Sequence, residues 1–337
     1  MKRVINFTII IFAVIIFLPL LIVKGCSSGV DDNSPGQQQA GIKIKVYINS
    51  QNVVKEMSLE EYVKGVVAAE MPADFEMEAL KAQAVAARTY ALGRMKRMYT
   101  SARDDSDKGA DVCTDPGHCQ AWVSKQQAMK KWKIFSAYRN WSKIESAVKS
   151  TENIVITYQG TIINPVFHSS SGGRTENSED VWGGAAVPYL KSVPSSGEES
   201  SPDYKSTTSF KTSEFISKLK SEYPKIKLNS KDILKDIKVL NRTEGGGVNT
   251  IKVGNLTLKG TDFRALFSLN STKFSIEKGS GDTLKITCIG NGHGVGMSQW
   301  GANSLAKNGG SYEEILKYYY TGINLGTIKS GAAPKPN

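Results

Sequence analysis

The sequence predicts an α+β protein, with a mixed body of two lobes around a central groove and one transmembrane helix before it. Three observations carry this prediction. Short stretches alternate apolar and polar residues, as strands with one buried face do. Other stretches repeat apolar residues every three or four positions, which is the spacing of a buried helix face. A long run of apolar residues lies near the start of the chain.

Length and charge narrow the class of protein. A chain of 337 residues has room for two domains or one large one. A formal net charge of +11 favours an anionic partner, whether nucleic acid, a membrane surface or an acidic polysaccharide. No basic block alternates with aromatic residues, as it does in proteins that bind single strands, so we expect no nucleic-acid partner.

The apolar run VINFTIIIFAVIIFLPLLIV occupies residues 4–23. A helix of about 20 residues spans roughly 30 Å, enough to cross a bilayer. Lys2 and Arg3 precede the run, so the N-terminus should stay inside and the remainder should be exported. A cleaved signal peptide is the alternative, but VKGC at 23–26 lacks a small-residue cleavage pattern. We expect four parts: a retained anchor (1–24), a polar linker (25–41), one folded domain (42–327) and a flexible tail (328–337).

One predicted helix places a carboxyl group on a buried face. Ser58 followed by Glu61 is a capping box, and Pro72 ends the helix because proline disfavours helical backbone in the residue before it. The buried face comprises Leu59, Tyr62, Val63, Val66 and Val67. Glu70 continues this face at the last turn, where burial would raise its pKa as a general acid requires. The alternative is a helix-end Glu paired with a nearby Lys or Arg.

The remaining elements follow from similar patterns. We expect an alanine-rich helix over residues 76–98 and a second helix over 130–149, whose aromatic residues recur every three positions and belong in the core. Alternation predicts hairpins at 42–57 and 154–166. Ser311 with Glu314 caps a last helix, and Cys288 lies on the buried face of a strand at 284–289.

A polar loop at residues 104–121 contains Cys113, His118 and Cys119. Two readings of this spacing stay open. On the exported side of a membrane, the two cysteines can close a disulfide loop. Alternatively, both thiolates and His118 can bind structural zinc with a carboxylate from Asp107, Asp111 or Asp115.

Two glycine-rich loops follow predicted strands. HSSSGGRT at residues 168–175 allows close backbone approach to a ligand, although a plain surface loop fits it equally well. GNGHGVGMSQWG at 290–301 has the strand–loop–helix order of a phosphate cradle. No Lys-Ser or Lys-Thr follows it, so we expect its glycines to bring His293 and backbone N–H groups to another substrate.

Five motifs in order resemble the stage II sporulation protein D family and the related amidase-enhancer proteins. They are GVVAAEMP (65–72), ALKAQAVAARTYAL (79–92), HCQAW (118–122), FHSSSGGRTENSEDVW (167–182) and HGVGMSQWGA (293–302). The resemblance covers roughly residues 42–325. It implies that this part is the catalytic domain and that the groove binds substrate.

The resemblance implies a sporulation lytic transglycosylase, a carbon–oxygen lyase that cuts peptidoglycan strands already stripped of peptide and forms 1,6-anhydro-muramic ends. Glu70 matches the catalytic glutamate of the family, and the chemistry needs no cofactor. The family is anchored in the mother-cell membrane by a single span, with its domain in the intermembrane space, and acts in engulfment of the forespore. A partner amidase and a membrane scaffold of the engulfment machinery are its expected partners.

The family motifs also give candidate binding residues. For the sugar groove they are Gln120, Ser170, His293, Ser298, Gln299 and Tyr320. Some members bind zinc at the cysteine loop through two cysteines and histidine. No His precedes Cys113 here, so either His118 or Asp107 completes such a site or the chain binds no zinc. The competing function is a non-catalytic glycan-binding module that activates a partner amidase.

Overall fold

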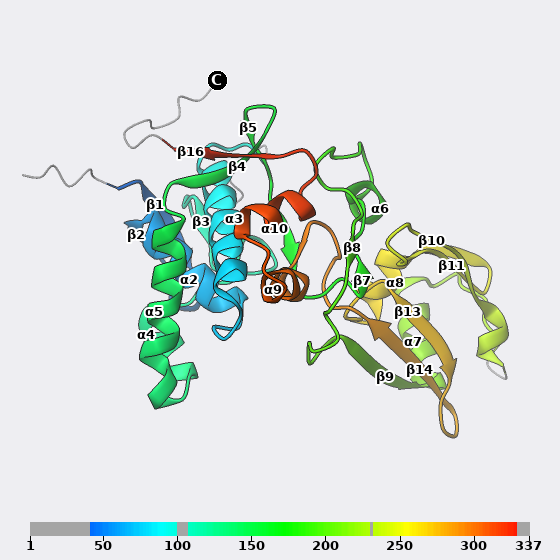
Figure 1. The fold of residues 1–337 in the computed structure, drawn as a ribbon. Coiled ribbons are helices and arrows are strands. Elements are labelled where there is room, and N and C mark those ends of the chain that lie inside the picture. The colour runs from blue at the N-terminus through cyan, green and yellow to red at the C-terminus, as the bar shows by residue number, and fades with distance from the viewer. Residues whose placement is uncertain (1–40, 100–106, 230–231, 329–337) are drawn as a thin grey trace, which may run out of the picture. The chain divides into compact units, whose positions relative to one another are not determined.

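The computed structural model describes residues 41–99, 107–229 and 232–328 (Figure 1). The predicted anchor and all but the last residue of the linker lie outside these ranges, as does the tail from residue 329. Among the residues described, no helix combines the length and the apolar character that a bilayer span requires. Helices and several small sheets follow one another, which confirms the mixed α+β class.

The helices and strands are numbered as in Figure 1. The helices are α2 (Leu59–Glu70), α3 (Met77–Met95), α4 (Lys125–Lys131), α5 (Ile134–Ser150), α6 (Ser178–Trp182), α7 (Thr212–Glu222), α8 (Gly260–Leu266), α9 (Gln299–Lys307) and α10 (Tyr312–Tyr319). The strands are β1 (Lys43–Ile48), β2 (Val53–Ser58), β3 (Val112–Cys113), β4 (Ile154–Tyr158), β5 (Thr161–Ile162), β6 (Phe167–His168), β7 (Gly173–Arg174), β8 (Pro194–Ser195), β9 (Lys205–Lys211), β10 (Ile237–Arg242), β11 (Val248–Val253), β12 (Leu256–Lys259), β13 (Phe274–Lys278), β14 (Thr283–Ile289), β15 (Met297–Ser298) and β16 (Asn324–Thr327). Short 3₁₀ turns occur at Asn49–Gln51 and Ile233–Asp236.

The first hydrophobic core surrounds α3, which packs against α2, α5, α9, α10 and β4 (Figure 1). Six alanines of α3 are completely buried, and their small side chains let the neighbouring helices approach closely. The hairpin of β1 and β2 and the short parallel strand β3 form a sheet that contributes Ile44, Val46 and Val112 to this core. The predicted hairpin at 42–57 is therefore confirmed.

The second hydrophobic core comes from residues 210–288. It lies between the antiparallel sheet of β13, β14 and β9, the sheet of β10, β11 and β12, and the helices α7 and α8. Phe215 stacks on Phe267 with ring centroids 4.5 Å apart. Cys288 is 2% exposed in this core, as its strand pattern predicted. Both cores use only residues of the compact unit Gly41–Asn337, so we expect this unit to fold without residues 1–40.

The two glycine-rich loops lie side by side. Strand β15 pairs in parallel with β6, which places Ser298 opposite His168. An isolated bridge then joins Ser170 to Asn291. These pairings place two segments side by side that are more than a hundred residues apart in the sequence.

Several predicted boundaries are confirmed and one helix is corrected. The Ser58 side chain accepts a hydrogen bond from the Glu61 N–H at 3.1 Å, so the predicted N-terminus of α2 is correct. The helix predicted over residues 130–149 is instead two helices, α4 and α5, broken at Trp132. Phe135 and Tyr138 face solvent rather than the core, because only the opposite face of α5 packs inward.

Candidate functional site

One cavity of about 460 Å³ joins the end of α2 to both glycine-rich loops. Pockets of this size accept small ligands or sugar units. Glu70, Gln120, His293 and Gln299 all contribute to its wall. The other lining residues are Tyr90, Pro116, Cys119, Pro165, Val166, Phe167, His168, Ser169, Asn291 and Gly292.

Glu70 is the last residue of α2, and it lines the cavity. Burial raises the pKa of its carboxyl group from an ordinary value of 4.5 to about 7. Hydrogen bonds from the Ala121 N–H, at 2.7 Å to Oε1, and from the Gln299 side chain favour the charged form and oppose this rise. Desolvation is the larger effect, so the carboxyl group is close to half protonated at neutral pH. No lysine or arginine is among the groups that shift this pKa, which argues against the ion-paired alternative.

Two glutamines support the carboxyl group from α9 and α3. The Gln299 Nε2 group donates to Gln83 Oε1 at 3.4 Å, and Gln83 is completely buried. Gln299 is 6% exposed and lines the cavity beside Glu70. This arrangement fixes the Gln299 amide so that it can donate to Glu70.

The loop before Ala121 contains a cluster of four candidate metal ligands: Asp107, Cys113, His118 and Cys119. Their ligand atoms all lie within 4.8 Å of one another. His118 Nδ1 lies 3.2 Å from Asp107 Oδ1, 3.3 Å from Cys113 Sγ and 3.5 Å from Cys119 Sγ. Tetrahedral zinc, with bonds of roughly 2.0 to 2.3 Å, separates its ligands by about these distances. The four residues therefore fit a closed structural zinc site.

The chemistry of the cluster also suits zinc. Cys113 and Cys119 are free thiols in the structure. Hydrogen bonds from the Cys113 thiol and then from its backbone N–H lower the pKa of Cys119 to about 6, although burial opposes this. Arg94 forms an ion pair with the fully buried Asp107 carboxylate. Metal ligands in proteins commonly have such supporting partners.

The chain connects the four candidate metal ligands directly to Glu70. Gln120 and Ala121 follow Cys119 in the chain, and the Ala121 N–H donates to Glu70. Trp122 packs over Gly65 of α2, where an added Cβ would lie only 2.1 Å from the indole nitrogen. A metal held by this loop would therefore stabilise the position of the Glu70 carboxyl group without touching the substrate.

His293 uses both ring nitrogens within the protein. The Val295 N–H donates to Nδ1 at 3.1 Å, and Nε2 donates to the Phe167 carbonyl oxygen at 2.9 Å. Burial lowers the pKa of His293 to about 3, so the ring is neutral near pH 7. His293 therefore lines the cavity and orders its loop, but neither nitrogen is available to a ligand.

Ser170, Ser298 and Tyr320 lie behind the cavity wall and do not line it. The Ser298 hydroxyl caps α9 by accepting from the Gly301 N–H at 3.2 Å. The Tyr320 hydroxyl donates to the Val166 carbonyl oxygen at 3.0 Å, and Ser170 is 2% exposed within the bridged loops. Ser298 and Tyr320 therefore make structural hydrogen bonds, whereas the buried Ser170 hydroxyl has no hydrogen-bond partner among the described residues.

Sequence reasoning missed three residues of the cavity and its rim. Tyr90 lines the cavity, although its alanine-rich helix gave no sign of this, and His168 lines it from the loop whose backbone, rather than this side chain, was expected to approach a ligand. His168 Nδ1 donates to the Val295 carbonyl oxygen at 3.1 Å, which leaves Nε2 without a hydrogen-bond partner among the described residues. Trp182 is 53% exposed, with its ring centroid 5.3 Å from that of His293. The available signal in the sequence is a tryptophan directly before the glycine pair 183–184.

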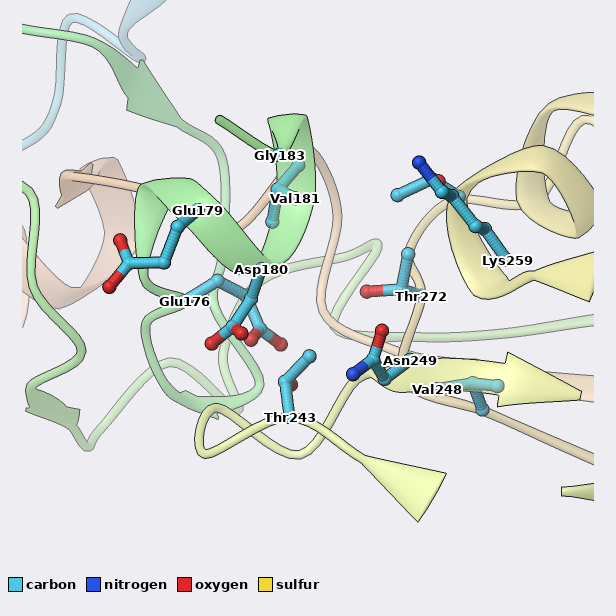
Figure 2. A pocket seen from close by; sticks show the side chains of 11 residues that line it. Glu176, Glu179, Asp180, Val181, Gly183, Thr243, Val248, Asn249, Lys259 and Thr272 are labelled. Atoms are coloured by element: carbon cyan, nitrogen blue, oxygen red, sulfur yellow. The ribbon is translucent and has the colours of Figure 1, made fainter. Parts of the chain in front are cut away.

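A second cavity of about 160 Å³ lies between α6 and residues of the second hydrophobic core region (Figure 2). Asp180, Val181 and Gly183 line it from one side, and residues 243–272 line it from the other. Glu176 is 1% exposed there, and burial is the main cause of its raised pKa. Because Trp182 contacts His293 while its neighbours line this second cavity, α6 stands between the two cavities.

The fold and the site define an α+β protein with a cavity of mixed polar and apolar lining and a carboxyl group whose pKa is raised to about 7. A family model described as "Stage II sporulation protein" matches residues 47–158, which include Glu70 and the four-residue cluster. Stage II sporulation protein D of Bacillus subtilis is 42% identical over 84% of this chain and 79% of its own length. Stage II sporulation protein D of Bacillus amyloliquefaciens is 40% identical over 88% of this chain and 82% of its own. The amidase enhancer of Bacillus subtilis is 29% identical over 78% of this chain and 40% of its own length.

These similarities extend over most of both chains for the first two relatives. The protein belongs to the stage II sporulation protein D family and takes part in sporulation.

Proposed function

We propose that the protein is a lytic transglycosylase that cleaves the bond between N-acetylmuramic acid and N-acetylglucosamine in peptide-free peptidoglycan strands. The observation that carries this proposal is the pKa of about 7 for Glu70 at the wall of the 460 Å³ cavity. A group with this pKa is present in both protonation states near neutral pH, as an acid that must later act as a base requires.

In the first step, protonated Glu70 donates its proton to the glycosidic oxygen. The bond from C1 of muramic acid to that oxygen breaks, and positive charge develops on the sugar as an oxocarbenium-like state. The Ala121 N–H, 2.7 Å from Oε1, stabilises the carboxylate that this step forms. The Gln299 amide adds a second donor to the same carboxylate.

In the second step, the Glu70 carboxylate takes the proton from the C6 hydroxyl of the same muramic residue. The C6 oxygen attacks C1 and closes the 1,6-anhydro ring, which returns Glu70 to its protonated form. The attacking group belongs to the substrate, so no water needs activation. One carboxyl group therefore suffices, and the paired carboxylates of ordinary glycosidases are not required.

Structural zinc belongs to this proposal as a support for the acid. Asp107, Cys113, His118 and Cys119 would hold the ion with all four positions filled. Zinc would there stabilise the fold of the loop, and every proton transfer remains with Glu70. A zinc hydrolase would need an open metal position, which a closed set of four ligands does not provide.

The substrate class follows from charge and from the rim of the cavity. A strand without peptides exposes one carboxylate per muramic residue, which a chain of net charge +11 attracts. The exposed indole of Trp182 beside His293 offers an apolar face on which a sugar ring of the same strand can lie.

The proposal also includes a location for the protein. A single-pass anchor would hold it in the mother-cell membrane, with the domain facing the intermembrane space during engulfment.

The test is a digestion of purified strands by unit 41–337. Peptide-free strands should yield products with 1,6-anhydro-muramic ends by mass spectrometry, and strands that retain their peptides should yield far less. Reducing muramic ends, the product of hydrolysis, would contradict the mechanism.

The similarity to a protein named "Amidase enhancer" favours a second candidate, a non-catalytic module that binds glycan and activates a partner amidase. In that case, unit 41–337 would release no product from peptide-free strands by itself. It would instead raise the rate of an added cell-wall amidase on strands with peptides. A partner amidase and a membrane scaffold are expected under either function.

A further inference from the structure

The first turns of α5 carry three large apolar side chains that face solvent. Ile134 is 77% exposed, Phe135 99% and Tyr138 76%. The next most exposed large apolar side chain among the described residues, Trp182, is 53% exposed. Positions three and four apart lie on one side of a helix, so these residues form one surface, here called the α5 tip patch.

No other part of the described chain covers the α5 tip patch. The helix packs inward through Ala137, Trp141 and Ile144, against α3, α2 and α4. Lys143 donates to the Asp74 carbonyl oxygen at 3.4 Å, which marks contact with the body of the domain. A helix rises about 1.5 Å per residue, so Phe135 lies about 12 Å further along its axis. The patch is therefore at a projecting end.

The patch is surrounded by positive charge. Residues 125–144 contain no Asp or Glu and six basic residues: Lys125, Lys130, Lys131, Lys133, Arg139 and Lys143. Lys125 lies 3.7 Å from Glu145, but the four cations nearest the patch form no ion pair within the described ranges. Solvated charges beside exposed apolar side chains are costly to bury against another apolar protein surface.

We infer that the α5 tip patch docks on an anionic lipid surface. The apolar side chains lie on α5, and the cations beside them come from α5 and from the adjoining end of α4. Large apolar side chains flanked by Lys and Arg are typical of segments that lie in the membrane interface. Three side chains are enough for shallow insertion, whereas a specific protein interface usually buries more than about 1,000 Å². The inference is independent of the chemistry at Glu70.

Contact between the α5 tip patch and a bilayer would be weak by itself. It would become stable if a second part of the chain were attached to the same membrane. Stable membrane binding generally takes two signals, such as an apolar anchor and a basic patch. The apolar run at residues 4–23 is predicted to supply the first of these. Docking of α5 would then limit how freely the domain rotates above the bilayer.

The test measures sedimentation of unit 41–337 with vesicles, so that the apolar run does not contribute. Vesicles of phosphatidylcholine with phosphatidylglycerol should bind the unit at least about tenfold more tightly than phosphatidylcholine alone. Added salt should weaken this binding, because it screens the attraction between Lys or Arg and the lipid phosphates. Equal binding to both vesicles, or none, would overturn the inference.

The apolar contribution is tested by a variant with Ile134→Ser, Phe135→Ser and Tyr138→Ser. These side chains are exposed, so the fold should be unaffected while binding to anionic vesicles falls about tenfold or more. Leu240→Ser, which changes an exposed leucine on β10, is the control and should bind within about twofold of wild type. A similar loss in the control would overturn the inference. So would wild-type self-association that the triple variant abolishes.

The charge contribution is tested with two variants of equal net charge. One changes Lys130, Lys131, Lys133 and Arg139 to Gln; the other changes the exposed Lys211, Lys220, Lys238 and Lys252 to Gln. The first should lose most of the binding to anionic vesicles, and the second should keep most of it. Equal losses would mean that total charge, rather than the patch, attracts the vesicles.

Discussion

Glu70 illustrates how one helix end sets the chemistry of a carboxyl group. The side chain continues the apolar face of α2, so it loses water, and burial raises its pKa. The Ala121 N–H and the Gln299 amide restore part of the lost hydration. Without these donors the pKa would be higher still, and less carboxylate would be present at neutral pH. The balance between burial, which raises the pKa, and these two hydrogen bonds, which lower it, gives a pKa of about 7. A general acid and base that works near neutral pH needs a pKa in this range.

The pH dependence of cleavage follows from this balance. The proposed first step needs protonated Glu70, so kcat/KM should be level below pH 7 and fall about tenfold per pH unit above it. Gln299→Ala removes a donor that favours the carboxylate, so the pKa should rise and the alkaline limb should move up by about one pH unit or less. A rate profile from pH 5 to pH 9 measures this shift.

Asn308→Ala is the matched control, because it removes an exposed amide at the end of the same helix. Its profile should coincide with that of the wild type. A Gln299→Ala limb that moves to lower pH would contradict the assigned hydrogen bond.

At the scale of elements, the loop of residues 107–122 connects the four candidate metal ligands to Glu70. We expect purified protein to contain about one zinc ion per chain, held by Asp107, Cys113, His118 and Cys119. Cys119→Ser should lower the zinc content and the melting temperature, because binding energy at a structural site contributes to folding. It should also reduce cleavage, since Ala121 is two residues away.

Cys288→Ser is the control for this prediction. Cys288 is 2% exposed in the second core and lies outside the cluster, so its loss should leave the zinc content unchanged. Metal analysis by mass spectrometry measures both variants. Wild-type protein without zinc would contradict the metal assignment and leave the acid chemistry intact.

At the scale of the whole molecule, burying Glu70 affects stability. The folded-state pKa of about 7 exceeds the unfolded value of 4.5, so the folded state binds the proton more tightly. Stability is therefore lost as pH rises from 4.5 through 7, and the loss is complete above pH 7. Glu70→Gln should be more stable than wild type at pH 8, by about 2 to 3 kcal/mol, and nearly equal at pH 4.

Urea unfolding of both proteins at the two pH values measures this difference. Glu152→Gln removes an exposed carboxylate and should change the free energy of unfolding by less than about 0.5 kcal/mol at either pH. Equal stability of wild type and Glu70→Gln at pH 8 would mean that the carboxyl group is well solvated.

Local patterns predicted much of the fold and the position of Glu70. Ser58 and Pro72 predicted the two ends of α2, and both hydrogen bonds of the Ser311–Glu314 capping box occur at α10. These features depend on residues three or four apart. Phe135 and Tyr138 were wrongly predicted to lie in the core, because helical periodicity does not say whether a partner exists for that face.

The environment of each groove residue depends on long-range pairing, which periodicity does not contain. Pairing of β6 with β15 brings the Phe167 carbonyl oxygen to His293 Nε2, and the bridge to Asn291 accompanies the burial of Ser170. The environment of Gln83 also depends on a distant residue. This polar side chain of an alanine-rich helix accepts a hydrogen bond from Gln299, 216 positions away in the sequence. Family resemblance selected loops that line the cavity, but only the structure separates lining residues from supporting ones.

The most direct test of the account is the cleavage of peptide-free strands by Glu70→Gln. Gln keeps the shape of the side chain and an acceptor for the Ala121 N–H but cannot donate the catalytic proton. Anhydro-muramic products should form at least about 10³-fold more slowly than with wild type, while Glu152→Gln stays within about twofold. Anhydro products from Glu70→Gln at close to the wild-type rate would show that another group supplies the proton.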